Sequence, residues 1–110
     1  MSTISTHVLD TVAGKPAAGI SVILESHTNN AWSAIAQSAT DPDGRCRNLI
    51  ANDAPGLYRL RFDTGAYFAQ QQRTSIYPEI VITFTCAAGE SHYHLPLLLS
   101  DNSYTTYRGS

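Results

Sequence analysis

Apolar and polar residues alternate along much of this chain, which is the pattern of β-strands that bury one face and expose the other. The clearest example is the run 57–62, in which a tyrosine, a leucine and a phenylalanine alternate with Arg59 and Arg61. The same alternation, together with many β-branched residues, predicts further strands over residues 2–10, 20–25, 32–38, 79–86 and 92–100.

Glycine, proline, asparagine and aspartate separate these predicted strands. The pair Asp43-Gly44 predicts a tight connection, and residues 27–30 predict a polar turn that leaves His27 in solvent. Helix-forming residues over 66–73 predict two turns of helix that end with Arg73. Seven or eight short strands and one short helix are typical of an antiparallel β-sandwich, and a small closed barrel is the other arrangement that the strand count allows.

The last predicted strand, 92–100, has one apolar face and one face that carries histidines. Positions 93, 95, 97 and 99 are a tyrosine and three leucines, whereas His92 and His94 point the other way. His7 lies in the first predicted strand and faces away from that strand's aliphatic residues. If the apolar faces line the core, three imidazoles project from the outside of the sheets.

Composition limits the classes of function. The 110 residues fit a single domain spanning 1–110, and 43% of them are hydrophobic, enough for a core without metal or disulfide support. A net charge of -2 with only 15% charged residues gives no electrostatic footprint for nucleic acid or an anionic membrane. No apolar run approaches the length of a membrane span, and the first ten residues lack the pattern of a secretory signal. We therefore expect a cytoplasmic protein in which Cys46 and Cys86 are reduced.

Outward histidines together with an arginine allow two kinds of hydrolytic site. A zinc ion could bind His92 and His94 from one strand face, with His7 as a third ligand. Alternatively, a neutral histidine deprotonates water while Arg45, which directly follows Asp43-Gly44, holds an anionic substrate and its developing oxyanion. Arg45 favours the metal-free site, because a fixed cation is repelled by a metal dication and attracted by an anion. A covalent acyl mechanism has little support, since the sequence has no Gly-x-Ser-x-Gly motif and neither cysteine lies in a nucleophile motif.

Short segments spread from the start to the end of the chain form a recognisable set. They are Ser5-Thr6-His7-Val8-Leu9-Asp10 with Gly14-Lys15-Pro16-Ala17, Asp43-Gly44-Arg45, Tyr77-Pro78-Glu79, His92-Tyr93-His94-Leu95-Pro96-Leu97-Leu98-Leu99-Ser100 and Tyr107-Arg108-Gly109-Ser110. Together they resemble the transthyretin-related 5-hydroxyisourate hydrolases over the whole chain. The terminal tetrapeptide is the most specific part, because it resembles the signature that separates these hydrolases from the hormone-carrying transthyretins, which share the fold.

The resemblance implies an eight-stranded, transthyretin-like β-sandwich that dimerises by edge strands and forms a homotetramer, a dimer of dimers with its sites at the dimer–dimer interface. It also implies hydrolysis of 5-hydroxyisourate, the unstable product of urate oxidation in purine catabolism, to 2-oxo-4-hydroxy-4-carboxy-5-ureidoimidazoline, with no cofactor and no metal. Which histidine is the general base stays open, because interacting imidazoles titrate as a pair. The alternatives are a transthyretin-like carrier of a small ligand and a zinc-dependent cyclic amide hydrolase. Catalytic roles carry over onto His7, Arg45, His94 and Ser110, and substrate binding onto His92, Tyr107, Arg108 and Gly109.

Three positions depart from the family pattern. Asp101 stands where a proline usually follows the leucine-rich strand, and Ile76 stands where an aromatic residue usually precedes the Tyr-Pro-Glu segment. Asp41 occupies a position where asparagine is common. None of the three belongs to the expected catalytic set, so we expect them to affect loop geometry more than activity.

Overall fold

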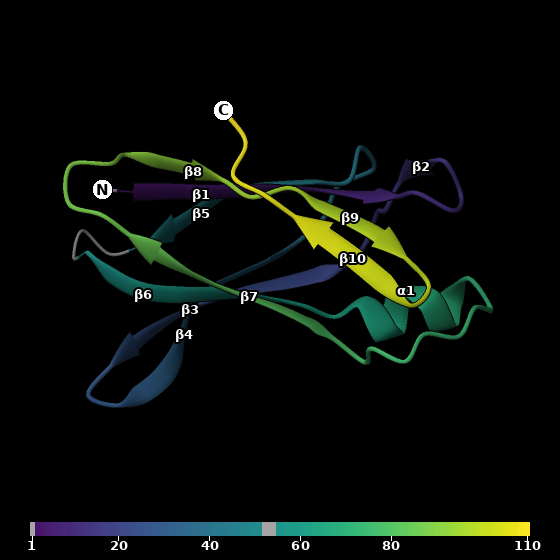
Figure 1. Cartoon of the computed structure of the whole chain (residues 1–110), viewed down its shortest axis with the longest axis horizontal. Helices are drawn as coiled ribbons and strands as arrows, with labels where there is room; N and C mark the ends of the chain where they lie inside the picture. Colours follow the sequence, from purple (N-terminus) through teal and green to yellow (C-terminus); the bar gives the residue numbers. More distant parts are fainter. Residues whose placement is uncertain (1, 52–54) are drawn as a thin grey trace.

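The computed structural model describes residues 2–51 and 55–110, which form two β-sheets and one helix (Figure 1). The all-β sandwich with one short helix is therefore confirmed. These residues contain ten strand segments, more than the seven or eight expected. The predicted strand 92–100 is divided in two, and the sequence pattern did not mark the strands at 15–16, 45–51 and 103–106. In chain order the elements are β1 (Ser2–Asp10), β2 (Lys15–Pro16), β3 (Ser21–Thr28), β4 (Ala31–Ala39), β5 (Arg45–Ala51), β6 (Gly56–Phe62), α1 (Thr64–Gln70), β7 (Ile80–Cys86), β8 (His92–His94), β9 (Leu97–Ser100) and β10 (Ser103–Thr106).

Strand β1 is the centre of the six-stranded sheet. It pairs antiparallel with β2 and β5 and parallel with β8 and β9, and β10 continues the sheet beyond β9. The four-stranded sheet has the order β4-β3-β6-β7, and all of its pairs are antiparallel. The expectation of purely antiparallel pairing thus needs correction for β8 and β9, because alternating side chains carry no information on strand direction.

The core lies between the two sheets and is built from alternate positions of their strands. As predicted, β8 and β9 turn their tyrosine and leucines inward, whereas His92 is exposed and His94 is half-buried. Each fully buried aliphatic side chain stabilises the fold by about 2 kcal/mol. The register is fixed for the same reason, since a slip of one residue would turn the histidines into the core. The fully buried residues include Ile4 and Val8 of β1, Leu24 of β3, Leu60 and Phe62 of β6, and Leu97 and Leu99 of β9.

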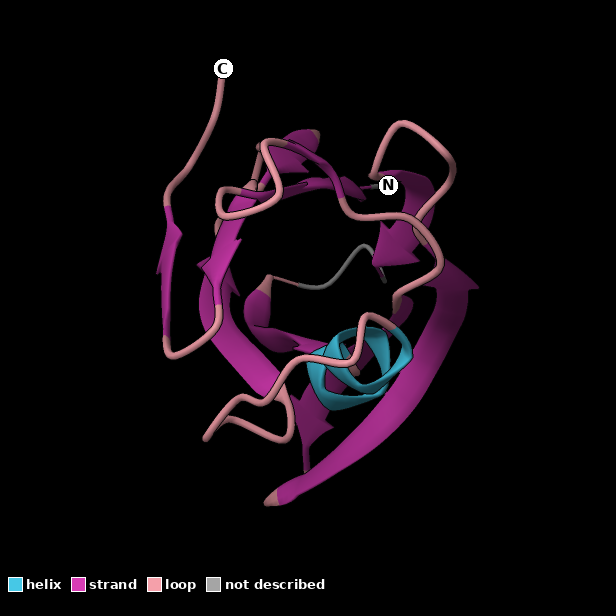
Figure 2. Cartoon of the chain, turned by 90° about the vertical axis from the view of Figure 1, so that its right-hand side faces the viewer, coloured by secondary structure: helices cyan, strands magenta, loops and turns pink. Residues whose placement is uncertain are grey.

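Helix α1 closes one end of the sandwich, between the edges of the two sheets (Figure 2). It begins two residues earlier than predicted, at Thr64, because the Asp63 side chain accepts a hydrogen bond from the Ala66 amide and so caps the first turn. It ends at Gln70, and Gln72 then adopts a positive φ of 57°. Arg73, which the sequence placed at the end of the helix, lies outside it.

Arg73 joins three separate parts of the chain through two carboxylates. Its guanidinium contacts Asp10 at the end of β1, with Nη1 2.5 Å from Oδ2, and also forms an ion pair with Asp101. Burial alone would raise the pKa of Asp10, but hydrogen bonds from Arg73, the Ala13 amide and Tyr67 outweigh burial and lower the pKa to about 2. Asp101, one of the departures from the family pattern, therefore helps to hold the β9–β10 turn against the segment after α1.

Two further predictions about local structure need correction. His27 is not in a turn but in β3, where its ring packs edge-on against Trp32, with the ring centroids 4.9 Å apart. The turn uses only Asn29 and Asn30, both with positive φ, as in a tight hairpin. Strand β10 was not predicted, because its residues are mostly exposed and show no apolar alternation.

Both cysteines are buried and unpaired, in agreement with the expected reduced thiols. Burial raises the pKa of the Cys46 thiol and that of the Cys86 thiol, which keeps both in the protonated, weakly nucleophilic form. Within the described ranges, no helix has the length and apolar character that crossing a membrane requires.

Candidate active site

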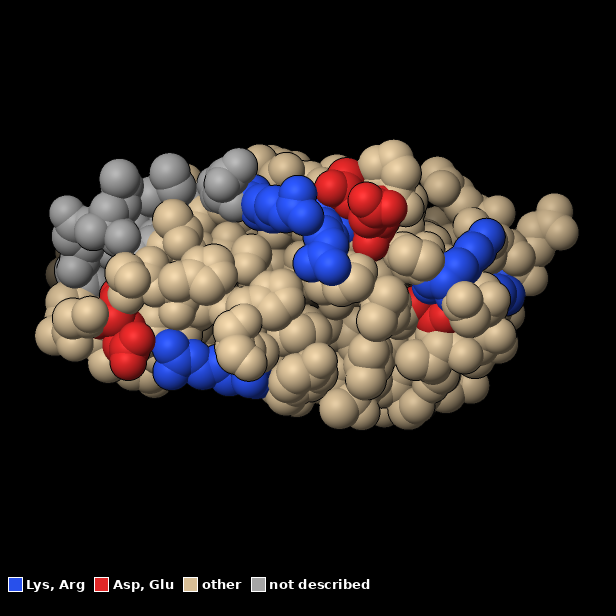
Figure 3. All heavy atoms as spheres, turned by 90° about the horizontal axis from the view of Figure 1, so that it is seen from above, with Lys and Arg blue, Asp and Glu red and all other residues tan. Residues whose placement is uncertain are grey.

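A cavity of about 370 Å³ opens beside the first half of β1. The strand pairings place its side chains together: Thr3 and Ser5 of β1 lie opposite His92 and His94 of β8, while β5 brings Arg45 to the other side of β1. On the molecule's upper face, which belongs to the six-stranded sheet, the charged side chains form a few small groups in which basic and acidic residues lie near one another, with uncharged surface between the groups (Figure 3). The residues that line the cavity are Thr3, Ser5, Thr6, Arg45, Arg47, His92, His94 and Ser110.

The turn before β5 fixes the position of Arg45. The Asp41 carboxylate accepts hydrogen bonds from the backbone amides of Asp43 and Arg45, each at 2.9 Å. Chiefly through the Arg45 amide, these bonds lower the pKa of Asp41. Gly44 has a φ of +77°, and a Cβ at this position would lie 2.4 Å from the Val8 carbonyl oxygen, so only glycine fits. The predicted tight connection is confirmed, and the hydrogen bonds to the Asp41 side chain hold its backbone in place.

His7 stands next to Arg45 in the register of β1 and β5, but it does not line the cavity. Its Nε2 atom lies 2.9 Å from the backbone carbonyl oxygen of Asp43. Because a carbonyl oxygen only accepts, Nε2 must carry the proton, and Nδ1 holds the lone pair when the ring is neutral. His7 is thus anchored to the turn that positions Arg45.

His94 is the histidine whose acidity the site changes most clearly. Burial lowers the pKa of His94, and the positive charges of Arg45, His92 and His7 lower it further. A lowered pKa keeps the imidazole neutral, and therefore able to accept a proton, at neutral pH. Its Nδ1 atom lies 2.8 Å from the Ser5 hydroxyl, so Nε2 is the nitrogen left for chemistry.

The C-terminal tetrapeptide contributes to the site through Gly109 and Ser110. The Gly109 amide donates to the His94 carbonyl at 2.7 Å, and a Cβ on Gly109 would lie 2.7 Å from Cδ2 of the His94 ring. The backbone therefore approaches the imidazole as closely as glycine allows, and this contact brings Ser110 to the cavity. Tyr107 is 54% exposed and lies outside the cavity lining.

Arg108 points away from the cavity in the single chain. Its guanidinium lies over the ring of Tyr93, 4.4 Å from the centroid, and Nη2 approaches Glu90 Oε2 at 3.4 Å and the His92 carbonyl at 3.3 Å. Of the eight residues predicted from the sequence, the structure thus brings Arg45, His92, His94 and Ser110 into the cavity. It places His7 opposite Arg45 and Gly109 against His94, both outside the cavity lining.

Sequence reasoning missed four residues of the lining: Thr3, Ser5, Thr6 and Arg47. The signal for Ser5 and Thr3 was present, since both share the outward face of β1 with His7. Arg47 likewise follows Arg45 by two positions in β5. Thr6 carried no such signal, because it points inward and donates to the Leu95 carbonyl at 2.6 Å.

The zinc arrangement expected as an alternative is not formed within one chain. In the described part of the molecule, no three side chains of His, Cys, Asp or Glu come together as ligands of one metal ion. His92 instead engages two hydroxyls, with Nδ1 2.7 Å from Thr3 Oγ1 and Nε2 3.3 Å from Ser5 Oγ.

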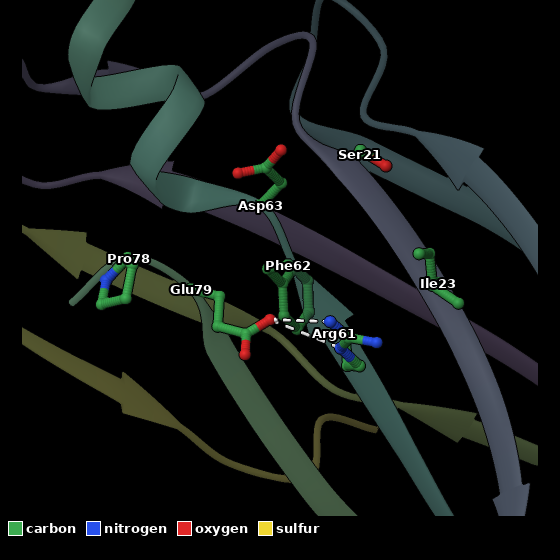
Figure 4. A pocket seen from close by; sticks show the side chains of 7 residues that line it. All are labelled: Ser21, Ile23, Arg61, Phe62, Asp63, Pro78 and Glu79. Atoms are coloured by element: carbon green, nitrogen blue, oxygen red, sulfur yellow. Dashed lines mark hydrogen bonds and ion pairs between the residues drawn. The ribbon is translucent and has the colours of Figure 1, made fainter. Parts of the chain in front are cut away.

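A second hollow, of about 350 Å³, lies on the four-stranded sheet near the start of α1 (Figure 4). Its polar groups are already engaged with one another: Arg61 Nη2 lies 3.1 Å from Glu79 Oε1, and Asp63 caps the helix. Ile23, Phe62 and Pro78 complete much of its wall. Its charged groups are therefore less available to a ligand than the arginines and histidines of the cavity beside β1.

The fold and the placement of the polar residues define a transthyretin-like sandwich with a histidine- and arginine-lined site. The sequence matches the HIUase/Transthyretin family over residues 4–109, and the chain therefore belongs to this family. Its relatives include the 5-hydroxyisourate hydrolase of Salmonella dublin, which is 44% identical over 109 residues, covering 97% of this chain and 80% of the relative.

Solved structures of both branches of the family resemble this chain. The 5-hydroxyisourate hydrolase of Klebsiella pneumoniae superposes with a TM-score of 0.87 at 39% identity and 100% coverage of both chains. Sea bream transthyretin in complex with thyroxine gives a TM-score of 0.90 at 35% identity, covering 96% of this chain and 93% of the other. The backbone of this chain is therefore similar both to a hydrolase and to a thyroxine-bound transthyretin, so the fold alone does not determine the function.

Proposed function

We propose that this protein hydrolyses 5-hydroxyisourate to 2-oxo-4-hydroxy-4-carboxy-5-ureidoimidazoline, a step of urate degradation. The relatives named as 5-hydroxyisourate hydrolases support this reaction, and so does the chemistry of the cavity beside β1. The observation that carries the proposal is the placement, in one cavity, of a histidine whose pKa is lowered and an arginine whose charge contributes to that lowering.

In this mechanism His94 takes a proton from a water molecule, and the water oxygen attacks an acyl carbon of the six-membered ring. The carbonyl oxygen of that carbon becomes an oxyanion, which the Arg45 guanidinium stabilises by charge and hydrogen bonds. When the oxyanion collapses, the acyl C–N bond breaks and the nitrogen takes the proton from His94. The acyl carbon stays attached to the opened molecule as a carboxylic acid, which releases the second proton of the water to solvent. One water is consumed, and the ring is opened without a redox step.

Other site residues take supporting roles in this proposal. His7 lies beside Arg45, and its charge helps to lower the pKa of His94. Ser110 adds a hydrogen bond to substrate or water from the cavity wall. His92 and Gly109 position His94, while Tyr107 and Arg108 shape the rim once a second subunit covers this face.

We also propose that the working form is a homotetramer, a dimer of dimers whose sites lie at the dimer–dimer interface. In a single chain the cavity is open and His92 is exposed, whereas water exclusion would strengthen every charge interaction in it. Light scattering should give four times the mass of the chain, and activity should fall on dilution in step with dissociation. A fully active monomer would remove assembly from the mechanism. The cytoplasmic location stays a prediction that cell fractionation can test.

The decisive experiment follows the ultraviolet decay of 5-hydroxyisourate, generated in place by urate oxidase, with and without this protein. We expect the decay to accelerate in proportion to the protein concentration. Thyroxine serves as the probe for the carrier alternative, for which the similarity to sea bream transthyretin is the reason. Tight thyroxine binding with no effect on the decay would make the protein a carrier and would overturn the proposed hydrolysis.

A further inference from the structure

The hydroxyl groups of β1 and the imidazoles of β8 interleave because the two strands run parallel. Thr3 stands opposite His92, and Ser5 stands opposite His94, with all four side chains on the cavity side of the sheet. Hydroxyls and imidazoles therefore alternate along the sheet, in the order Thr3, His92, Ser5, His94.

Every neighbouring pair in this row lies within hydrogen-bond distance. Thr3 Oγ1 is 2.7 Å from His92 Nδ1, Ser5 Oγ is 3.3 Å from His92 Nε2, and Ser5 Oγ is 2.8 Å from His94 Nδ1. At the outer end, the Thr3 hydroxyl donates to the Ser91 carbonyl oxygen at 3.4 Å. His94 stands at the inner end, in the cavity wall.

The Ser91 carbonyl gives this row a direction, since a carbonyl oxygen can only accept a hydrogen bond. A hydroxyl has one proton, so Thr3, when it donates to Ser91, must accept from Nδ1–H of His92. Neutral His92 then has a bare Nε2, which accepts the proton of Ser5. Ser5 has no second proton to donate, and it accepts from Nδ1–H of His94.

We propose that Thr3, His92 and Ser5 are positioning residues that hold neutral His94 as its Nδ1–H tautomer, with the lone pair on Nε2. This inference rests on the proposed hydrolysis for its purpose, and it assigns the general base to Nε2 of His94. The Gly109 backbone, packed against Cδ2, fixes the ring plane from the other edge. His7 has the opposite tautomer, because its Nε2–H is committed to the Asp43 carbonyl.

The reversed row would disable the base. If Thr3 donated to His92 Nδ1, each following proton would shift by one place, and His94 would carry its proton on Nε2. A nitrogen that already carries a proton cannot take one from water. The direction in which Thr3 donates its hydrogen bond therefore determines whether Nε2 of His94 carries a proton. Hydrogen-bond partners outside the immediate site fix the tautomers of catalytic histidines in the same way.

The tautomer can be read directly, without substrate, from two-bond ¹H–¹⁵N correlations of the labelled imidazoles at about pH 8, where histidines are neutral. We expect His94 to show a protonated Nδ1 and a bare Nε2. Thr3→Val and Ser5→Ala should shift His94 toward a mixture of tautomers, whereas Thr3→Ser and Ser5→Thr should keep the original pattern. A Nε2–H tautomer in the unaltered protein, or spectra unaffected by Thr3→Val and Ser5→Ala, would overturn the inference.

Kinetics give the second measurement. We expect kcat to fall about tenfold in Thr3→Val and about a hundredfold in Ser5→Ala, with KM nearly unchanged and kcat restored by the hydroxyl-retaining variants. Thr83→Val is the matched control, since Thr83 is an exposed strand threonine on β7 of the other sheet. An equal fall of kcat in Thr83→Val, or no fall of kcat in Ser5→Ala, would contradict the positioning role proposed for Thr3, His92 and Ser5. A protein with the expected tautomer but no hydrolysis would refute the proposed function and leave the assignment of the tautomer intact.

Discussion

The outer-face arginines of the two sheets differ in how closely carboxylates approach them: those of β6 form ion pairs, whereas Arg45 and Arg47 of β5 feel only the charge of nearby Asp41. On the four-stranded sheet, Arg59 Nε lies 2.5 Å from Glu25 Oε1, and Arg61 contacts both Glu25 and Glu79. On the six-stranded sheet, Arg45 and Arg47 form no ion pair with a described residue, and they face imidazoles across the cavity. A compensated arginine holds strands together, whereas an uncompensated one remains available to an anion.

The comparison also separates two hollows of similar size. The hollow near α1 has an internal ion pair, so a charged ligand entering it would have to break Arg61 from Glu79 (Figure 4). In the cavity beside β1, the lining holds cationic and neutral groups and no carboxylate, and the nearby Asp41 carboxylate is engaged by the backbone amides of its own turn. Cavity volume alone would not have chosen between them.

The largest effect is expected from the histidines. His94→Ala and His7→Ala should each lower kcat/KM for 5-hydroxyisourate by at least about a hundredfold, because each removes a proton acceptor or its partner. His27→Ala is the matched control on the four-stranded sheet, where His27 packs against Trp32, and it should leave the rate unchanged. A near-normal rate in either site variant would remove that histidine from the mechanism.

The arginines test the comparison most directly. Arg45→Ala should lower kcat/KM by about a hundredfold through loss of oxyanion stabilisation, with little change in the free energy of unfolding. Arg59→Ala should do the reverse: it leaves the nearly buried Glu25 carboxylate with weaker compensation, which costs about 1–2 kcal/mol of stability, and it spares the rate. Urea denaturation and the ultraviolet assay measure the two effects side by side. If both variants lost activity equally, the two faces would not differ in role.

A smaller loss is expected from the C-terminal tetrapeptide. Gly109→Ala places a methyl group 2.7 Å from Cδ2 of His94 and should lower kcat about tenfold by turning the ring. Deletion of residues 107–110 should damage catalysis more than folding. Gly14→Ala is a useful control, because no atom lies within 4 Å of its added Cβ, although its φ of +71° costs some stability. A truncated protein with full activity would show that the tetrapeptide is not part of the site.

The smallest effect on the rate is expected where a carboxylate and an arginine are already paired inside the fold. Asp10 has its pKa lowered to about 2, so its ionised form contributes about 2 kcal/mol of stability above about pH 4. This contribution is lost as the pH falls through about 2. Asp10→Asn should therefore lower the free energy of unfolding at pH 7, with a difference that shrinks below pH 4, while the rate at neutral pH stays near normal. A constant difference across this range would assign the effect to packing.

Much of the fold could be predicted because burial controls it. The alternation in β1, β6 and β8 set which residues face inward, and the structure agrees at each of them. Other features depend on single hydrogen bonds or on partners distant in sequence. The start of α1 depends on the Asp63 cap, and the parallel pairing of β8 with β1 depends on the whole sheet.

The candidate site was predictable to a similar extent. Arg45 and His94 could be chosen because their residue types carry chemistry and their strands turn them outward. Thr3 and Ser5 gave only a weak signal, their place on the outward face of β1, because hydroxyls are common on exposed strand faces and gain a role only from the imidazoles beside them. Ser110 and Gly109 came from the resemblance of the terminal tetrapeptide alone.

The parallel pairing of β1 with β8 also determines when this site can exist during synthesis. Ser5 and His94, whose side chains meet at 2.8 Å, are separated by 89 positions in the sequence, so Ser5 is made well before its partner. The growing chain can form the β3–β4 hairpin early, since these strands are adjacent in sequence. The cavity lacks His92 and His94 until β8 has been made. The cavity is therefore complete only after β8 has paired with β1.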